Sequence, residues 1–223
     1  MITDNIIGRT INIKYNGSTG TSFAFDYDSK QYYITAKHVI ENIKDGDCLE
    51  VLYNKVWNKH SIKLVGHSKN YDISVIVLDD CKIENEPIIG DSDNVVYSGD
   101  VYFLGFPYNI SNLTHKKDDI LPLPLVKKGI ISGFKNDEPV KTFFIDGINN
   151  PGFSGGPIVY RYPNSVEVKI CGVVSGFRYE LQRVKSIDET TEMDIKVNTG
   201  IIIGYGIEEA INLIISNPVG RLR

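Results

Sequence analysis

Short β-rich runs separated by turn residues follow one another along nearly the whole sequence, and this pattern constrains the fold more than any other feature. The runs that indicate strands lie at 6–13, 21–25, 31–35, 48–53, 61–66, 73–78, 100–106, 125–132, 141–146, 157–160, 166–175 and 197–203. A polar turn at 26–30 joins the second and third runs into a hairpin. Strands at this density predict an all-β protein, either a sandwich or a pair of barrels.

Two features divide this series of strands. The turn Gly90-Asp91-Ser92-Asp93 separates it into two halves, and apolar residues at 210, 211, 213, 214 and 215 indicate a short helix over 208–216 that Asn217-Pro218 stops. We therefore expect an N-terminal barrel over residues 1–95, a C-terminal barrel over 96–206, and a helix and tail over 207–223.

Composition excludes several classes of function. The 223 residues carry a net charge of −4 without a large cluster of lysine and arginine, so nucleic acid is not expected as a partner. The apolar runs are far shorter than the roughly 20 residues that a membrane helix needs, and the first residues lack the pattern of a signal peptide. Cys48, Cys81 and Cys171 are odd in number and widely spaced, which favours reduced thiols in a cytoplasmic protein. No histidine has a second ligand at metal spacing, so neither a metal nor another cofactor is expected.

The stretch Gly152-Phe153-Ser154-Gly155-Gly156-Pro157 has the composition of a nucleophile loop. A serine hydroxyl is a weak nucleophile at neutral pH, so it needs an imidazole to accept its proton and backbone N–H groups to receive the oxyanion. Glycine at 152 leaves one such N–H open, and the N–H of Ser154 is the second candidate. Taken alone, such a stretch is more often a glycine-rich β-turn with an incidental serine.

The order of the candidate groups along the chain limits the fold. All four histidines, at 38, 60, 67 and 115, precede Ser154. In an α/β-hydrolase the catalytic histidine comes later in the sequence than the serine, and a helix follows the serine directly. Here all histidines come earlier, and Pro157 and two β-branched residues follow the serine. The α/β-hydrolase fold is therefore excluded. Among the carboxylates, Asp72 directly precedes a strand, while Asp79 and Asp80 come at its end, where solvated turn residues are expected. Asp72 is therefore the favoured partner of a histidine.

Three segments in this order resemble the chymotrypsin-like (trypsin-like) serine proteases. Thr35-Ala36-Lys37-His38-Val39 resembles the Thr-Ala-Ala-His segment of that family, and Tyr71-Asp72-Ile73-Ser74-Val75 resembles its Asp-Ile-Ala-Leu segment. Pro151-Gly152-Phe153-Ser154-Gly155-Gly156-Pro157 resembles the Gly-Asp-Ser-Gly-Gly-Pro loop, with phenylalanine in place of aspartate. The resemblance implies two six-stranded antiparallel Greek-key β-barrels packed together.

The sequence is most similar to the protease domain of the bacterial HtrA (Deg) branch, over about residues 17–214. Further segments with counterparts there are Gly20-Thr21-Ser22-Phe23, Gly90-Asp91-Ser92-Asp93, Ser98-Gly99-Asp100, Leu104-Gly105-Phe106-Pro107, Gly129-Ile130-Ile131-Ser132 and Asn150-Pro151-Gly152. Each match is short, and their correct order over the chain is what carries the likeness.

By this resemblance, the chain is a serine endopeptidase in which His38 is the general base, Asp72 orients its imidazole and Ser154 attacks the scissile carbonyl. The N–H groups of Gly152 and Ser154 would hold the oxyanion. The strand Cys171-Gly172-Val173-Val174-Ser175 would pair with the substrate backbone, and Ser175 would lie behind Asp72. Peptides or proteins are the partners that this activity implies.

The resemblance says less about specificity. The base of the primary pocket falls on Ile148, and the residues that follow the substrate strand, Gly176 and Phe177, are expected to border the same pocket together with Val174 and Ser175. No acidic residue lies there, so a small or medium apolar residue is expected before the cleaved bond. The charged segment 178–196 is expected to be a solvated loop at the edge of the cleft.

Two departures from the relatives affect regulation. Phe153 cannot form the ion pair with a new N-terminus that activates secreted zymogens, so no such maturation is expected. The chain ends at Arg223 without the PDZ domain that follows HtrA protease domains, so substrate choice and any activation are expected to depend on the barrel loops or on a protein partner. An alternative is a latent enzyme or a peptide-binding module that retains the fold without cleaving.

Overall fold

The computed structural model describes residues 2–116, 119–136, 138–162, 165–185 and 192–223. Six strands form a ring in the N-terminal half, in the order β3-β2-β1-β4-β5-β6, which the pairing of β3 with β6 closes. Their bounds are β1 Thr10–Tyr15, β2 Ser18–Tyr27, β3 Lys30–Thr35, β4 Cys48–Tyr53, β5 Val56–His67 and β6 Ser74–Leu78. The short strand β15, Arg221–Leu222, adds to the outer edge of β3.

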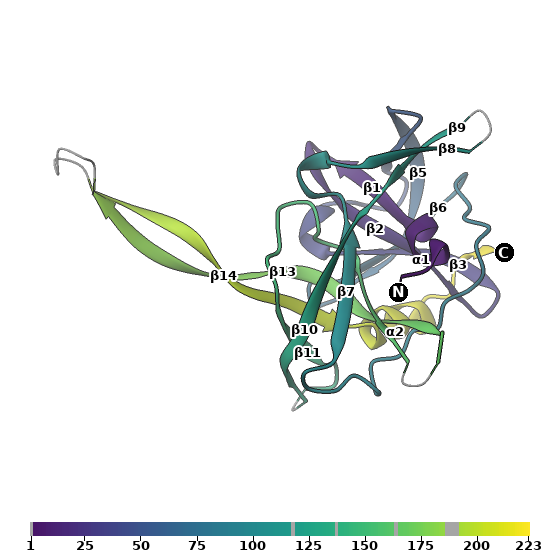
Figure 1. Cartoon of the computed structure of the whole chain (residues 1–223). Coiled ribbons are helices and arrows are strands. Elements are labelled where there is room, and N and C mark those ends of the chain that lie inside the picture. Colours follow the sequence, from purple (N-terminus) through teal and green to yellow (C-terminus); the bar gives the residue numbers. More distant parts are fainter. Residues whose placement is uncertain (1, 117–118, 137, 163–164, 186–191) are drawn as a thin grey trace.

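The second half forms a closed antiparallel barrel in the order β10-β11-β14-β13-β12-β7 (Figure 1). Its strands are β7 Asp100–Gly105, β10 Leu125–Lys135, β11 Thr142–Asp146, β12 Pro157–Arg161, β13 Val168–Lys185 and β14 Glu192–Gly206. Two further strands, β8 Asn112–Lys116 and β9 Asp119–Leu123, pair only with each other. The prediction of an all-β protein with two six-stranded barrels is confirmed.

Helices occupy the two ends of the chain. The terminal helix α2, Glu208–Ser216, lies where the sequence pattern predicted it. The predicted strand over 6–13 is wrong in its first half, because Asp4–Arg9 form a short helix, α1, and the strand begins at Thr10. Ile6 and Arg9 lie on the buried side of α1, where the Arg9 guanidinium pairs with Asp26 at 2.7 Å. A helical turn places both side chains inward at once, whereas alternation along a strand would send them to opposite faces.

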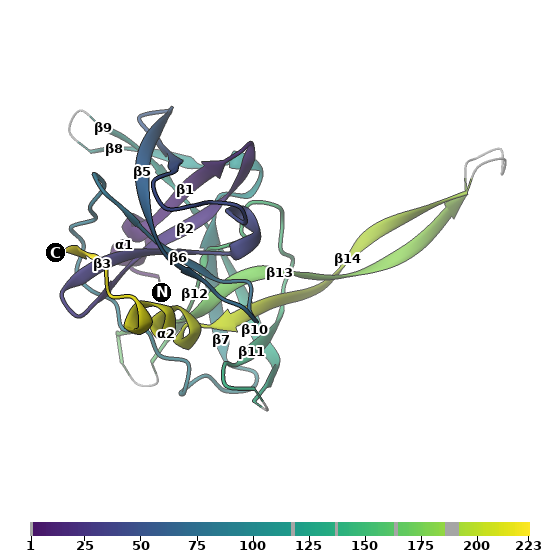
Figure 2. The same cartoon turned by 180° about the vertical axis from the view of Figure 1, so that it is seen from behind.

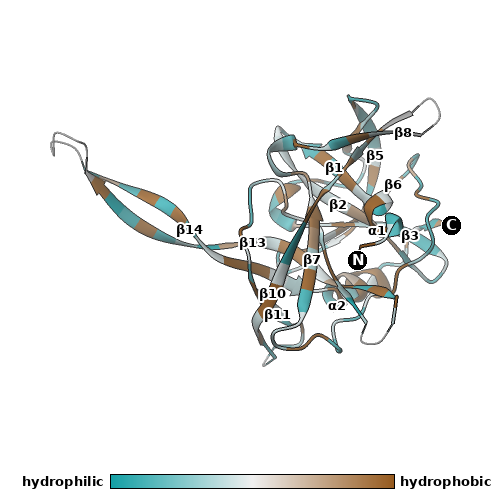
Figure 3. Cartoon of the chain, in the orientation of Figure 1, coloured by the Kyte–Doolittle hydropathy of each residue, from teal (hydrophilic) through white to brown (hydrophobic). Residues whose placement is uncertain are grey.

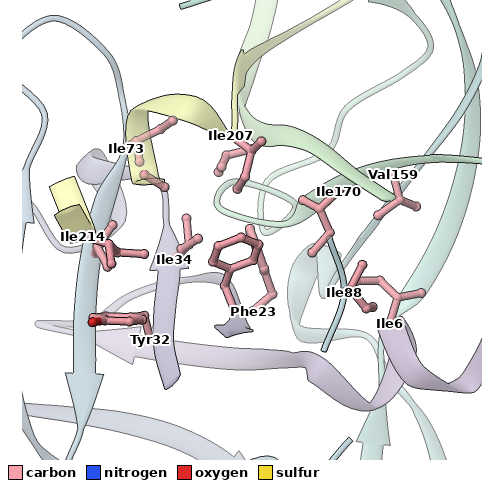
Figure 4. Packing of buried hydrophobic residues seen from close by; sticks show 14 of the residues in the cluster. Ile6, Phe23, Tyr32, Ile34, Ile73, Ile88, Val159, Ile170, Ile207 and Ile214 are labelled. Atoms are coloured by element: carbon pink, nitrogen blue, oxygen red, sulfur yellow. The ribbon is translucent and has the colours of Figure 1, made fainter. Parts of the chain in front are cut away.

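A shared hydrophobic cluster joins the two barrels (Figure 4). Phe23 and Ile34 from the first barrel, Val159 and Ile170 from the second, and Ile214 from α2 all belong to it. Each of these five side chains is buried. Because burial of one such side chain is worth roughly 1.5–3 kcal/mol, this cluster fixes the two barrels against each other.

In the segment 178–196, expected to be a solvated loop, residues 178–185 and 192–196 form strands instead, and the rest lies outside the described residues. β13 and β14 continue past the barrel as a two-stranded hairpin, paired from Tyr179 with Asn198 to Lys185 with Glu192. This hairpin, which we call the arm, extends away from both barrels, as Figure 2 shows from behind. Figure 3 shows hydrophilic and hydrophobic residues mixed along it. Among the charges that suggested a loop, Arg183 forms a cross-strand pair with Asp194 at 3.3 Å.

No helix among the described residues is long and apolar enough to cross a membrane. The three cysteines, Cys48, Cys81 and Cys171, are free thiols.

Candidate active site

His38 lies in a single 3-10 turn, η1 (Lys37–Val39), directly after β3. Ala36 and Val39 on either side are buried and anchor the turn, while half of the His38 side chain remains exposed to solvent. The imidazole Nδ1 lies 2.6 Å from Oδ2 of Asp72, and the backbone N–H of His38 donates to Oδ1 of the same carboxylate at 2.9 Å. Both oxygens of Asp72 therefore orient His38, leaving Nε2 directed away from the carboxylate.

Asp72 precedes β6 and is held among hydrogen-bond donors from both barrels. Besides His38, the Ser175 hydroxyl of β13 donates to its Oδ2 at 2.6 Å. Burial raises the pKa of this carboxyl, but the hydrogen bonds from His38 and Ser175 outweigh burial and lower it below the ordinary value. Asp72 is thus a carboxylate at neutral pH. The rival Asp80 is engaged elsewhere, because its Oδ1 lies 2.7 Å from Nδ1 of His60.

Ser154 follows a tight turn between β11 and β12, and backbone hydrogen bonds hold this turn on both sides. The Ser154 carbonyl accepts from the N–H of Thr21 at 2.9 Å, which ties it to the first barrel. The N–H of Gly155 donates to the Val174 carbonyl at 2.7 Å, which ties it to β13. The Ser154 hydroxyl itself donates to the Ser175 carbonyl at 3.0 Å rather than to the imidazole.

Gly152 adopts φ +108°, a conformation that favours glycine. A Cβ at this position would lie 2.3 Å from the Phe106 carbonyl oxygen, so the backbone fits only without a side chain. The preceding Pro151 carbonyl accepts from the N–H of Tyr108 at 2.9 Å, and no peptide bond of the described chain is cis. In a trans peptide the N–H points opposite to the C=O, so the Gly152 N–H is directed away from Tyr108. In the described part of the chain, no hydrogen bond engages the N–H of Gly152 or of Ser154.

Two groups support this turn from behind. The Phe153 side chain is completely buried and contacts Phe103 edge to face, with ring centroids 5.1 Å apart. The Lys127 ammonium donates to the Ile148 carbonyl and, at 3.2 Å, to Oδ1 of Asn150. Burial lowers the pKa of Lys127. Lys127 therefore holds the residues before Gly152, and the aromatic pair holds the residue after it.

The residues expected to contact a substrate surround the serine to different degrees. Val174 is buried, Ser175, Gly176 and Phe177 are partly exposed, and Ile148 is exposed on the surface. Ser92, in the similar triplet Gly90-Asp91-Ser92, is buried, and its N–H donates to Glu208. No group of three histidine, cysteine, aspartate or glutamate side chains in the described chain is arranged to hold a metal ion.

Sequence reasoning missed the groups that fix the nucleophile turn. The Thr21 hydroxyl is fully buried, donates to the Gly152 carbonyl at 2.6 Å and accepts from the N–H of Phe106 at 3.1 Å. Thr21 and Gly152 are 131 residues apart in sequence, so no local pattern indicates their contact. Tyr108 has φ 53°, which no sequence signal predicted, and Lys127 is one of several lysines in its segment.

The two barrels, with a paired histidine and aspartate facing a serine turn, define a chymotrypsin-like fold. Residues 19–164 match the family model described as the trypsin-like peptidase domain, and the chain therefore belongs to this family. No curated protein sequence matched the chain.

Solved structures agree with this assignment at the level of the fold. The HtrA-type protease AlgW with a tripeptide superposes with a TM-score of 0.62 and 21% sequence identity, over 96% of this chain and 62% of the AlgW chain. An inactive form of Rv3671c from M. tuberculosis H37Rv superposes with a TM-score of 0.60 and 14% identity, over 96% of this chain and 89% of the other. The chain thus spans less than two thirds of the AlgW chain that it matches.

Proposed function

We propose that this protein is a serine endopeptidase that uses His38, Asp72 and Ser154 as a catalytic triad. The observation that supports the proposal best is a continuous set of hydrogen bonds between the two barrels. Asp72 accepts from both His38 and Ser175, and the Ser175 carbonyl accepts from the Ser154 hydroxyl. Three segments distant in sequence, from two barrels, thus bring a base, its orienting carboxylate and a hydroxyl to one place.

In the proposed reaction, the Ser154 hydroxyl rotates from the Ser175 carbonyl to Nε2 of His38 and transfers its proton there as Oγ attacks the substrate carbonyl. The free N–H groups of Gly152 and Ser154 receive the negative charge that forms on the carbonyl oxygen. His38 then donates the proton to the leaving amine, which leaves an acyl-enzyme. A water molecule, deprotonated by His38, hydrolyses the acyl-enzyme and restores Ser154.

The proposed substrates are peptides or unfolded segments of proteins. The AlgW structure, whose fold this chain shares, was determined with a tripeptide, which supports a peptide as the ligand. The partly exposed residues Ser175, Gly176 and Phe177 offer a strand edge for pairing with a substrate backbone. Because isoleucine and not an acidic residue stands at position 148 itself, we propose a small or medium apolar residue before the cleaved bond.

A second candidate is a latent form that needs a partner, or a module that binds peptides without cleaving them. The hydrogen bond from the Ser154 hydroxyl to the Ser175 carbonyl favours it, because that hydroxyl must leave the bond before it can give its proton to His38. The two candidates differ in the reactivity of Ser154 in the isolated protein.

The test is intact-protein mass spectrometry after treatment with a fluorophosphonate, with peptide mapping of the adduct. We expect one adduct on Ser154, lost in Ser154→Ala and slowed by roughly 10³-fold in His38→Ala. Ser92→Ala is the matched control and should label as the unmodified protein does. A folded protein that is not labelled, or whose labelling does not need His38, would overturn the endopeptidase proposal and favour the latent or binding form.

A further inference from the structure

The arm presents a long unpaired strand edge that begins inside the candidate active site. β12 pairs with β13 only as far as Val173, and Val174 then exchanges backbone hydrogen bonds with Gly155 and Gly156 of the nucleophile turn. Over residues 175–185, β14 is the only strand in the described chain that pairs with β13. The opposite edge of β13 therefore remains open for about 35 Å.

We propose that this open edge binds the substrate segment that precedes the cleaved bond, and that the pairing extends along the arm past the first few residues before that bond. The inference rests on the proposed function, because it uses Ser154 to fix where the substrate chain ends. A peptide that pairs antiparallel with β13 runs along the arm toward the barrels. The carbonyl group of the bond to be cleaved lies at the C-terminal end of this paired segment and so reaches Ser154. Residues before the cleaved bond therefore lie against the arm, in the direction that acyl transfer to Ser154 requires.

The directions of the backbone groups fit this arrangement. The Ser175 carbonyl faces the Ser154 hydroxyl, on the side of the open edge. The Arg178 carbonyl accepts from the Thr199 hydroxyl and therefore points toward β14. In the trans peptide that follows Arg178 the N–H of Tyr179 points the opposite way, to the open edge, and because the pairing is regular from Tyr179 onward, Leu181 and Arg183 direct their backbone groups there too. If the residue before the cleaved bond lies opposite Ser175, then Leu181 lies opposite the seventh residue before that bond.

The open edge of β13 differs from the open edge of β14. β11 covers β14 from Ile201 onward, so the edge of β14 leads into the wall of the second barrel and not to the nucleophile turn. Only β13 connects an open edge with Ser175. Its residues 174–185 include no proline, the residue that commonly blocks strand pairing at exposed edges.

The side chains of the arm indicate the chemistry of the bound segment. Tyr179 and Leu181 on β13 are 48% and 61% exposed, and Met193 and Ile195 on β14 are 59% and 42% exposed. The charged residues of the described arm are of both signs, and Arg183 pairs with Asp194 at 3.3 Å. Both faces thus offer exposed apolar surface without a dominant charge, which fits an extended, weakly charged segment of an unfolded protein.

The experiment measures kcat/KM as a function of peptide length. Cleavage sites in β-casein, an unfolded protein, are mapped by mass spectrometry, and peptides with four, six, eight and ten residues before the strongest site are synthesised. We expect kcat/KM to rise about tenfold or more from four to ten residues, as additional strand hydrogen bonds form.

Proline substitutions locate this gain on one edge of the arm. Leu181→Pro removes an outward N–H without breaking the pairing to β14, and it should reduce the ratio of kcat/KM between ten- and four-residue peptides to about one. Lys196→Pro lies directly opposite on β14, where its N–H faces the other edge, and it should retain the full ratio.

Each other result has a distinct meaning. Cleavage that does not depend on length, or an equal effect of the two prolines, overturns the arm proposal and leaves the proposed protease activity standing. No cleavage of β-casein and no fluorophosphonate adduct overturns both. A dimer in sedimentation experiments that Leu181→Pro converts to a monomer shows that a second copy occupies the edge, and it also overturns the substrate role.

Discussion

Replacing Thr21 with valine tests whether one side chain of the first barrel holds the nucleophile turn of the second. The Thr21 hydroxyl is fully buried, donates to the Gly152 carbonyl at 2.6 Å and accepts from the N–H of Phe106 at 3.1 Å. Valine has nearly the same shape, so Thr21→Val creates no cavity. It leaves two buried backbone groups without a partner.

The magnitude follows from these two groups. Each buried polar group that loses its partner costs about 1–3 kcal/mol, so we expect a loss of about 3 kcal/mol in the free energy of unfolding. With an m-value of about 3 kcal/mol per molar urea, the unfolding midpoint should fall by about 1 M. Peptide hydrolysis should fall as well, because the carbonyl released by the substitution belongs to Gly152, whose N–H we propose as an oxyanion donor.

Urea unfolding followed by circular dichroism provides the measurement, and Thr19→Val provides the control. Thr19 lies two residues earlier on β2, is only partly buried, and makes no side-chain hydrogen bond within the described chain. The control should unfold within about 0.5 kcal/mol of the unmodified protein. Equal midpoints for Thr21→Val and the unmodified protein would refute the argument that Thr21 holds the turn.

Two further predictions concern partly buried charges. Burial raises the pKa of Asp91, but hydrogen bonds from Lys169 and from the N–H of Asp93 outweigh it and lower the pKa to about 2. Because the folded chain releases this proton at lower pH than the unfolded chain, the stabilisation is complete above about pH 4 and is lost toward pH 2. Asp91→Asn should therefore lower the free energy of unfolding by about 2 kcal/mol at pH 7 and by much less at pH 2, as measured by urea unfolding. The same substitution at the exposed Asp93 is the control. A loss that does not change with pH would contradict the prediction. Lys127→Met removes the hydrogen bonds to the Ile148 carbonyl and to Asn150. It should lower kcat about tenfold more than Lys128→Met, because the Lys128 ammonium pairs with Asp100 on the surface. Equal effects of the two substitutions in a peptide-cleavage assay would contradict the prediction.

Sequence patterns predicted the structural features that depend on residues close together in the chain. Runs of β-forming residues located most strands of both barrels, and the apolar spacing near the C-terminus located α2. The order of His38, Asp72 and Ser154 pointed to segments that the fold indeed brings together, with the His38 Nδ1 at 2.6 Å from Asp72. The strands and α2 were predicted correctly because each depends on residues close together in the chain, whereas the catalytic roles of His38, Asp72 and Ser154 stay predictions.

The groups that position the nucleophile turn depend on contacts across the fold. Thr21 reaches Gly152 only after both barrels have closed, and the N–H of Tyr108 meets the Pro151 carbonyl only because its segment turns back through a left-handed residue. The arm was missed for a different reason. Its residues mix charged and apolar types on both faces, which resembles a loop in sequence, since neither face is buried against a core.

The position before Ser154 connects the fold to the question of when the site forms. In secreted zymogens of this family an aspartate at that position needs a new N-terminal amine, so the turn is assembled only after cleavage. Here the buried Phe153 packs against Phe103, and Lys127 lies 5.6 Å from its ring centre. All three residues belong to the second barrel, so packing within that barrel supplies the anchor. Because Thr21 of the first barrel also bonds the Gly152 carbonyl, assembly of the nucleophile turn is coupled to folding of the second barrel and to its docking on the first.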